Sequence, residues 1–266
     1  MRVIDSHTHC FPDDLAERAI CRLVSGYHVT PSFDGTIKGL IAQMDAVGIE
    51  ASVVVPVATK ESQVKPINDW AAGIRHPRVI PFGAVHPDLA DLADEMARIK
   101  GLGLRGVKIH PNWQQFKPQD PAVFPMYEAL VANDLIAYFH GGDELEKWPE
   151  PIVATPFAFS EVHRQFPNMR MVVAHMGGYL MWDEVEEYLI GKDVYFDVSA
   201  CFPEYLPDER LLPMMRAHGM EKILWASDSP CSDPLSQLNR ILSLPLTDEE
   251  KEMICWRNAV RLLGLE

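Results

Sequence analysis

The sequence lacks any long apolar run and any close pair of cysteines. None of its apolar stretches approaches the ~20 residues that a membrane-spanning helix needs, and its first residues do not resemble a signal peptide. The five cysteines are odd in number, widely spaced and free of Cys-x-x-Cys pairs, which favours a reducing compartment over a disulfide framework. We therefore expect a soluble cytoplasmic protein with no membrane partner.

Basic residues are also scarce. The chain has 24 Lys and Arg against 38 Asp and Glu, for a formal charge of −14, and no cluster of basic residues occurs. Nucleic acids and anionic membrane surfaces are bound through basic patches that displace counterions from phosphates. The composition therefore predicts a small-molecule substrate and no nucleic-acid partner.

Short apolar or β-branched runs recur along the whole chain. Several are continuously apolar, as expected for parallel strands buried on both faces. The runs cover residues 2–9, 51–57, 79–85, 105–110, 135–140, 169–175, 194–199 and 222–228. Segments with helical signals lie between them, such as the stretch that begins at Asp120-Pro121 and the capping-box pattern from Thr247 to Glu250.

Strands that alternate with helices, without a linker or a break in composition, predict an α/β fold. We expect a (β/α)8 TIM barrel that forms a single domain over residues 1–266. A doubly wound open sheet is the alternative. No Gly-x-Gly-x-x-Gly follows the first predicted strand and no P-loop occurs, although the commonest open-sheet cofactor-binding proteins would show one or the other, which favours the barrel.

Histidine and aspartate residues cluster at the predicted carboxyl ends of the strands, where the active sites of TIM barrels lie. His7 and His9 are spaced i and i+2, so a strand places both imidazoles on one face, where they can share a metal ion. The ends of later strands supply His110, His140, His175 and Asp228. Chance would rarely place so many there, so we predict a metal site.

The ordered motifs on these strand ends resemble the metal-dependent amidohydrolase superfamily, in the branch that includes aminocarboxymuconate semialdehyde decarboxylase. The resemblance covers essentially the whole chain. The motifs are Asp5-Ser6-His7-Thr8-His9, Gly106-Val107-Lys108-Ile109-His110-Pro111, Phe139-His140, Val173-Ala174-His175-Met176-Gly177-Gly178, Asp197-Val198-Ser199-Ala200 and Ala226-Ser227-Asp228-Ser229-Pro230.

The resemblance implies a site for one divalent cation, most often zinc, with manganese as the alternative. Its implied ligands are His7, His9, His140 and Asp228. His175 is implied to be a catalytic group beside the cation, and a homodimer is compatible with the family. The donor chemistry agrees, since imidazole and carboxylate suit zinc, and an open position can bind a water whose pKa falls to ~7.

The main functional prediction is hydrolysis of a small-molecule amide, ester or lactone. Metal-bound water would attack the carbonyl carbon, Asp228 would take the proton of that water, and His175 would polarise the carbonyl. The alternative is a non-oxidative decarboxylase of an unsaturated or aromatic carboxylic acid with the same ligands. We favour hydrolysis because the chain is short for the decarboxylase branch and its first loop lacks a clear arginine. A silent barrel is disfavoured because the ligand set is complete.

Four further residues are expected to contact the substrate or to support the metal ligands. Lys108 and His110 share one face of a strand by alternation. In some branches of the superfamily a lysine at this strand is carboxylated and bridges two metal ions, so a two-metal centre is the alternative for Lys108. Phe11 and Trp113 follow the first and fourth strands, in loops that commonly carry binding residues.

Overall fold

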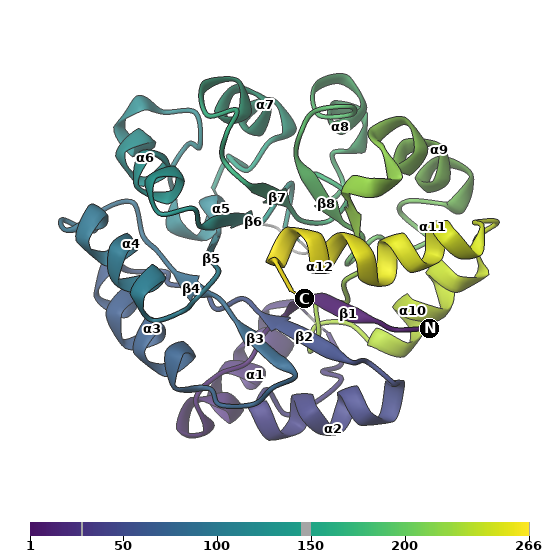
Figure 1. The fold of residues 1–266 in the computed structure, drawn as a ribbon, viewed down its shortest axis with the longest axis horizontal. Coiled ribbons are helices and arrows are strands. Elements are labelled where there is room, and N and C mark those ends of the chain that lie inside the picture. The colour runs from purple at the N-terminus through teal and green to yellow at the C-terminus, as the bar shows by residue number, and fades with distance from the viewer. Residues whose placement is uncertain (28, 145–149, 266) are drawn as a thin grey trace. The chain divides into compact units, whose positions relative to one another are not determined.

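The computed structural model describes residues 1–27, 29–144 and 150–265, and the chain divides into two compact units. The first unit comprises Met1–Val54, Arg75–Ile80 and Asp197–Glu266, and the second comprises Val55–Ile74 and Pro81–Phe196. Parallel strands alternate with helices in both units (Figure 1). The assignment of the chain to a single domain stays a prediction.

The first unit is built around β1, whose five residues are all buried. β1 pairs in parallel with β2, and its other edge lies along residues 225–229, where the Ser6 N–H donates to Trp225 O (3.2 Å) and the His9 N–H to Ser229 O (2.7 Å). The elements of this unit are β1 (Ile4–Thr8), α1 (Asp13–Tyr27), α2 (Ile37–Val47), β2 (Ala51–Val54), β3 (Val79–Pro81), α9 (Asp208–His218), β9 (Ile223–Leu224), α10 (Pro234–Ser243), α11 (Asp248–Glu252) and α12 (Asn258–Leu263).

The second unit contains a parallel sheet in the order β4-β5-β6-β7-β8. The pairing of Ile109 with Phe139 brings the residues that follow β5 and β6 next to each other. The α-helices and β-strands of this unit are α3 (Val64–Gly73), β4 (Gly83–Ala84), α4 (Leu92–Gly101), β5 (Gly106–Ile109), α5 (Pro111–Gln114), α6 (Phe124–Ala132), β6 (Ile136–Phe139), α7 (Pro156–Gln165), β7 (Met171–Val173), α8 (Trp182–Tyr188) and β8 (Tyr195–Asp197), whose last residue, Asp197, is counted with the first unit.

The predicted strands are all present, although each is shorter than its apolar run. The third run is split into β3 and β4. The last strand ends at Leu224, so Asp228 lies in the following turn rather than at the strand end, with a φ of +61°. His175 likewise follows β7 in a left-handed conformation, with a φ of +60°. Neither residue lies on a strand, so the alternation of side chains along a strand does not predict the directions of these two side chains.

The capping box that the sequence predicts near its end is confirmed. The Glu250 N–H donates to Thr247 Oγ1 (3.2 Å), and the Thr247 N–H donates to Glu250 Oε2 (2.7 Å). These two bonds satisfy backbone donors at the start of α11, which a helix end otherwise leaves without a partner.

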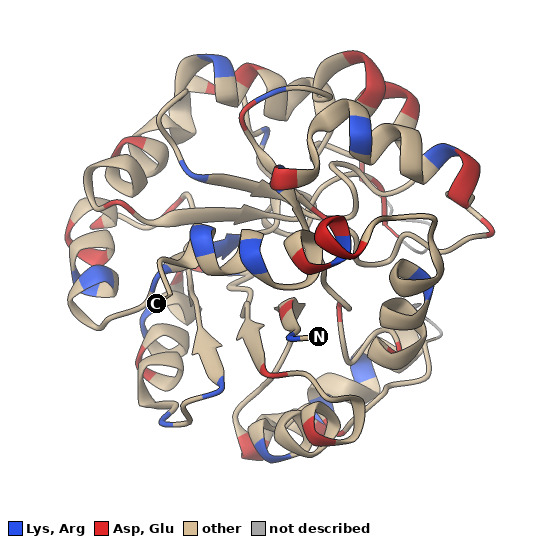
Figure 2. Ribbon diagram, turned by 45° about the vertical axis from the view of Figure 1, so that its right-hand side comes forward, with Lys and Arg blue, Asp and Glu red and all other residues tan. Residues whose placement is uncertain are grey.

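The surface carries both signs of charge. Figure 2 shows acidic and basic positions interspersed along the helices. Among the residues that the structure describes, no helix is both long and apolar enough to cross a lipid bilayer.

A stability prediction arises at Gly142, after β6, where φ is +91° and an added Cβ would lie 2.1 Å from Tyr179 N. We expect Gly142→Ala to lower the free energy of unfolding by about 3 kcal/mol or more, because the contact is with backbone that cannot move aside. Gly191 also has a positive φ but open space around it. Gly191→Ala should therefore lose only about 1 kcal/mol from backbone strain. Urea denaturation measures both variants, and equal losses would contradict the steric explanation.

Candidate metal centre

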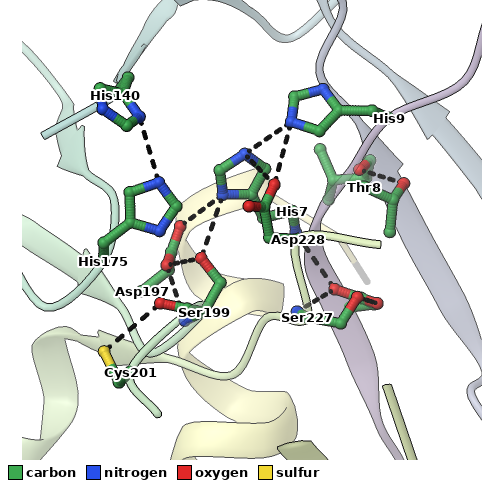
Figure 3. Close-up of polar contacts among 12 residues, drawn as sticks. His7, Thr8, His9, His140, His175, Asp197, Ser199, Cys201, Ser227 and Asp228 are labelled. Atoms are coloured by element: carbon green, nitrogen blue, oxygen red, sulfur yellow. Dashed lines mark hydrogen bonds and ion pairs between the residues drawn. The ribbon is translucent and has the colours of Figure 1, made fainter. Parts of the chain in front are cut away.

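Three side chains of the first unit point their donor atoms at one another (Figure 3). His7 Nε2 lies 3.2 Å from His9 Nε2 and 3.4 Å from Asp228 Oδ1, and His9 Nε2 lies 3.1 Å from Asp228 Oδ1. The backbone holds this arrangement, because the Asp228 N–H donates to His7 O at 2.9 Å. The turn that carries the carboxylate is thereby attached to the strand that carries the histidines.

The size of this triangle suits a single cation. Four donors at tetrahedral positions around zinc, each about 2.0 to 2.1 Å away, are separated by about 3.3 Å. Adjacent donors around an octahedral ion at about 2.1 Å are separated by about 3.0 Å. The observed edges of 3.1 to 3.4 Å fit either geometry. Two imidazoles and a carboxylate are also a donor set that divalent transition metals accept.

Asp197 binds the ring nitrogen of His7 that does not face His9 and Asp228. The sequence did not predict this role. The His7 Nδ1–H donates to Asp197 Oδ2 at 2.9 Å, and the Ser199 N–H and Oγ–H donate to Asp197 Oδ1 at 2.9 and 2.5 Å. All three residues are buried. Because Nδ1 carries the proton, the lone pair of His7 lies on Nε2, the atom that faces His9 and Asp228.

Asp5 connects β1 to the turn before Asp228. Its Oδ1 accepts the Ser227 N–H at 2.9 Å, and its Oδ2 accepts the Ser227 hydroxyl at 2.6 Å. Burial raises the pKa of Asp5 to about 7, against the opposing effect of these hydrogen bonds. The motif aspartate therefore holds the turn in place instead of facing the other donors.

In the second unit, His140 and His175 lie side by side. His175 Nε2 is 3.2 Å from His140 Nδ1, as the dashed line in Figure 3 marks. His140 directly follows β6, and the Trp182 indole N–H donates to the carbonyl of His175 at 3.2 Å. Both histidines are buried, so their rings are held by the surrounding packing.

Of the four residues predicted to contact the substrate or support the ligands, Lys108, His110 and Trp113 lie in the second unit and Phe11 lies in the first. His110 is stacked between two rings, with centroids 4.0 Å from His140 and 4.1 Å from Trp113. Lys108 is 1% exposed, and its Nζ lies 4.9 Å from the centroid of the Tyr138 ring. Phe11 follows β1 in the first unit, where its N–H donates to Gly35 O at 2.9 Å. The roles of these residues stay predictions.

Comparison with known families identifies the chain as a whole. The sequence profile of the amidohydrolase family matches residues 4–265. The chain belongs to the amidohydrolase family. It is an enzyme of the amidohydrolase superfamily, as the strand-end motifs predict.

Three solved structures illustrate the similarity, each 18% identical to this chain. A 5-carboxyvanillate decarboxylase from Sphingomonas paucimobilis matches with a TM-score of 0.76 over 100% of this chain and 99% of its own. A dihydroxybenzoic acid decarboxylase from Polaromonas, with bound manganese and the inhibitor 2-nitroresorcinol, matches with a TM-score of 0.76 over 99% and 97%. A candidate 2-pyrone-4,6-dicarboxylic acid hydrolase from Pseudomonas putida matches with a TM-score of 0.72 over 100% and 98%. The predicted fold class, an α/β (β/α)8 barrel, is confirmed.

The same comparison corrects the prediction of hydrolysis. The similar structures are mainly decarboxylases, which favours the alternative function. The argument from chain length was wrong, because the match spans 99% of the carboxyvanillate decarboxylase. The motifs could not decide the matter, because the same histidines and aspartate can hold a cation that activates water or one that binds a carboxylate.

A prediction follows from the contact between Asp197 and His7. We expect Asp197→Asn to weaken divalent metal binding by about 10- to 100-fold, because the amide holds the His7 ring less firmly and lowers its basicity. Competition with a chromophoric chelator measures the affinity. Asp14→Asn on the exposed face of α1 is the control and should bind like the wild type. Unchanged affinity in Asp197→Asn would refute the supporting role.

Proposed function

We propose that this chain is a divalent-metal-dependent decarboxylase of a small aromatic or unsaturated carboxylic acid. The observation that carries the proposal is the donor triangle of His7, His9 and Asp228, whose edges of 3.1 to 3.4 Å suit one cation. It occurs in a fold whose similar structures are mostly decarboxylases. Their names specify carboxyvanillate and dihydroxybenzoate, and these names are the basis for the substrate class proposed here.

The three members of the triangle would hold the resident cation, and His140 is the fourth ligand that the family resemblance implies. Three neutral imidazoles and one carboxylate leave a divalent cation with a net charge of about +1. When bound, the cation supplies positive charge that orients the substrate carboxylate. The nitrogen-rich donor set favours zinc, and the manganese in the Polaromonas enzyme makes manganese the other candidate.

The reaction replaces a carboxylate by a proton. The bond between the substrate carbon and its carboxylate breaks, CO2 leaves, and the electron pair stays on the carbon, which then takes a proton. His175 is the proposed donor of that proton, because an imidazole titrates near neutral pH and its ring is held beside His140 at 3.2 Å.

The remaining polar and aromatic residues are proposed to bind the substrate. Lys108 ends in a buried amino group that suits a second acidic or phenolic group of the substrate. His110 would donate a hydrogen bond to the same kind of group, and Trp113 and Phe11 would contact the ring of the substrate.

The test combines metal content with product detection. Metal is measured per chain in freshly purified protein, and the protein is then loaded with Zn²⁺ or Mn²⁺ and supplied with hydroxybenzoates and unsaturated carboxylic acids. We expect about one metal ion per chain and one CO2 for each substrate consumed. Full metal occupancy without CO2 from any of these acids would refute the proposal.

A further inference from the structure

Glu144 is a buried carboxylate next to the candidate ligand His140. Its side chain is 4% exposed. The Asn112 Nδ2–H donates to Glu144 Oε1 at 2.8 Å. The same oxygen lies 3.5 Å from His140 Nε2 and 3.9 Å from His110 Nδ1. Burial of a carboxylate is costly unless polar partners compensate, so these contacts indicate a role for it.

The orientation of Asn112 is determined by its other contacts. Its Oδ1 accepts the N–H groups of Val153 and Ala154, each at 3.0 Å. Its Nδ2 therefore faces the opposite way, toward Gly142 O at 3.0 Å and Glu144 Oε1. A flipped amide would lose all of these bonds. Asn112 thus holds Glu144 in place as an acceptor.

The cluster of His110, His140 and Glu144 has donor atoms close enough to suggest a second metal site. The ring geometry argues against it. A metal ion bound by an imidazole nitrogen lies in the plane of that ring, because the lone pair lies there. The rings of His110 and His140 are stacked 4.0 Å apart and are parallel to within 5°. Their planes do not meet near the cluster, so one ion cannot bind to both.

The contacts of His140 instead define which of its nitrogens carries the proton. His140 Nε2 lies 3.3 Å from Asp143 O, and a carbonyl oxygen can only accept. Glu144 Oε1, at 3.5 Å, is a second acceptor on the same side. The proton therefore lies on Nε2 and the lone pair on Nδ1, which faces His175.

We propose that Glu144 is a positioning residue that keeps the proton of His140 on Nε2 and its lone pair on Nδ1, ready to bind a metal. This inference rests on the proposed function, in which His140 is a ligand. A carboxylate that accepts a hydrogen bond from the other ring nitrogen of a metal-binding histidine fixes the ring and makes it more basic, which strengthens metal binding. Glu144 would thus do for His140 in the second unit what Asp197 does for His7 in the first.

The test is Glu144→Gln, which removes the charge but keeps the size of the side chain. We expect the dissociation constants for Zn²⁺ and Mn²⁺, measured by chelator competition, to rise by about 10- to 100-fold. Glu128→Gln, on the exposed side of α6, is the matched control and should leave both constants unchanged. The metal content at saturation should be one ion per chain, and two ions would overturn the argument from the stacked rings.

A second readout is independent of metal and of turnover. In metal-free protein labelled with ¹⁵N in its histidines, long-range proton–nitrogen NMR should show His140 with its proton on Nε2. Glu144→Gln should raise the share of the Nδ1 tautomer, because the carbonyl of Asp143 is then the one unaltered acceptor left of the two described on the Nε2 side. If Glu144→Gln does not fold, Glu144→Asp replaces it. If His140 of the wild-type protein carries its proton on Nδ1, the inference is overturned without any variant. Unchanged affinity and tautomer in a folded variant would also overturn it. If the wild-type protein has the proton of His140 on Nε2 and binds metal but releases no CO2, the proposed function is refuted and the inference about Glu144 is not.

Discussion

Asp228→Asn is expected to lose the proposed metal binding and the proposed decarboxylase activity together. Asp228 supplies the one carboxylate of the donor triangle, 3.1 Å from His9 Nε2 and 3.4 Å from His7 Nε2. An amide carries no charge and is a weaker ligand. We expect metal affinity to fall at least about 100-fold and kcat/KM at least about 1000-fold.

Asparagine is the right replacement because of the backbone at this position. Asp228 has a φ of +61°, a conformation that asparagine tolerates and alanine does not. Asp228→Ala would therefore mix the loss of a ligand with strain in the turn. Metal analysis after dialysis, together with CO2 release, measures the effect, and Asp14→Asn again serves as control. A variant that keeps its metal would remove Asp228 from the ligand set.

His175→Asn is expected to keep the cation and lose turnover. The proposed role of His175 is proton transfer, which typically contributes about 100- to 10,000-fold to a rate. We expect kcat to fall within this range, while metal content stays at the wild-type level. Asparagine also suits the positive φ of +60° at this position.

The two variants separate the roles of the two residues. Loss of metal in His175→Asn would place His175 among the ligands, and normal turnover would show that another group provides the proton. Retention of metal with low activity in His175→Asn, beside loss of both in Asp228→Asn, is the pattern that the proposed function requires.

The sequence was sufficient for the part of the site that lies on or directly after strands. His7 and His9 share a face because side chains alternate along β1, and the structure places their Nε2 atoms 3.2 Å apart. His110 and His140 follow paired strands, so the register of β5 and β6 makes them neighbours, and their rings are stacked. Pattern and periodicity thus predict neighbours where the backbone is regular.

The sequence was not sufficient where the backbone leaves regular geometry or where function depends on the substrate. Asp228 and His175 lie in left-handed turns, whose side-chain directions no periodicity predicts. The hydrolase prediction was wrong because the same types of ligand suit both reactions, so the ligand motifs do not distinguish them.

The sequence by itself determined the family and the parallel α/β fold, because these depend on ordered motifs and on the pattern of apolar runs. The set of metal ligands stays a prediction. Only the tertiary structure revealed that the carboxylates of Asp197 and Glu144 lie next to the rings of His7 and His140. Asp197 lies 190 residues from His7. Glu144 is four residues from His140, but it is held in place by Asn112, which lies 32 residues away. Such pairs form when the chain folds and leave no local pattern, since a hydrogen bond between distant segments depends on their packing and not on their spacing.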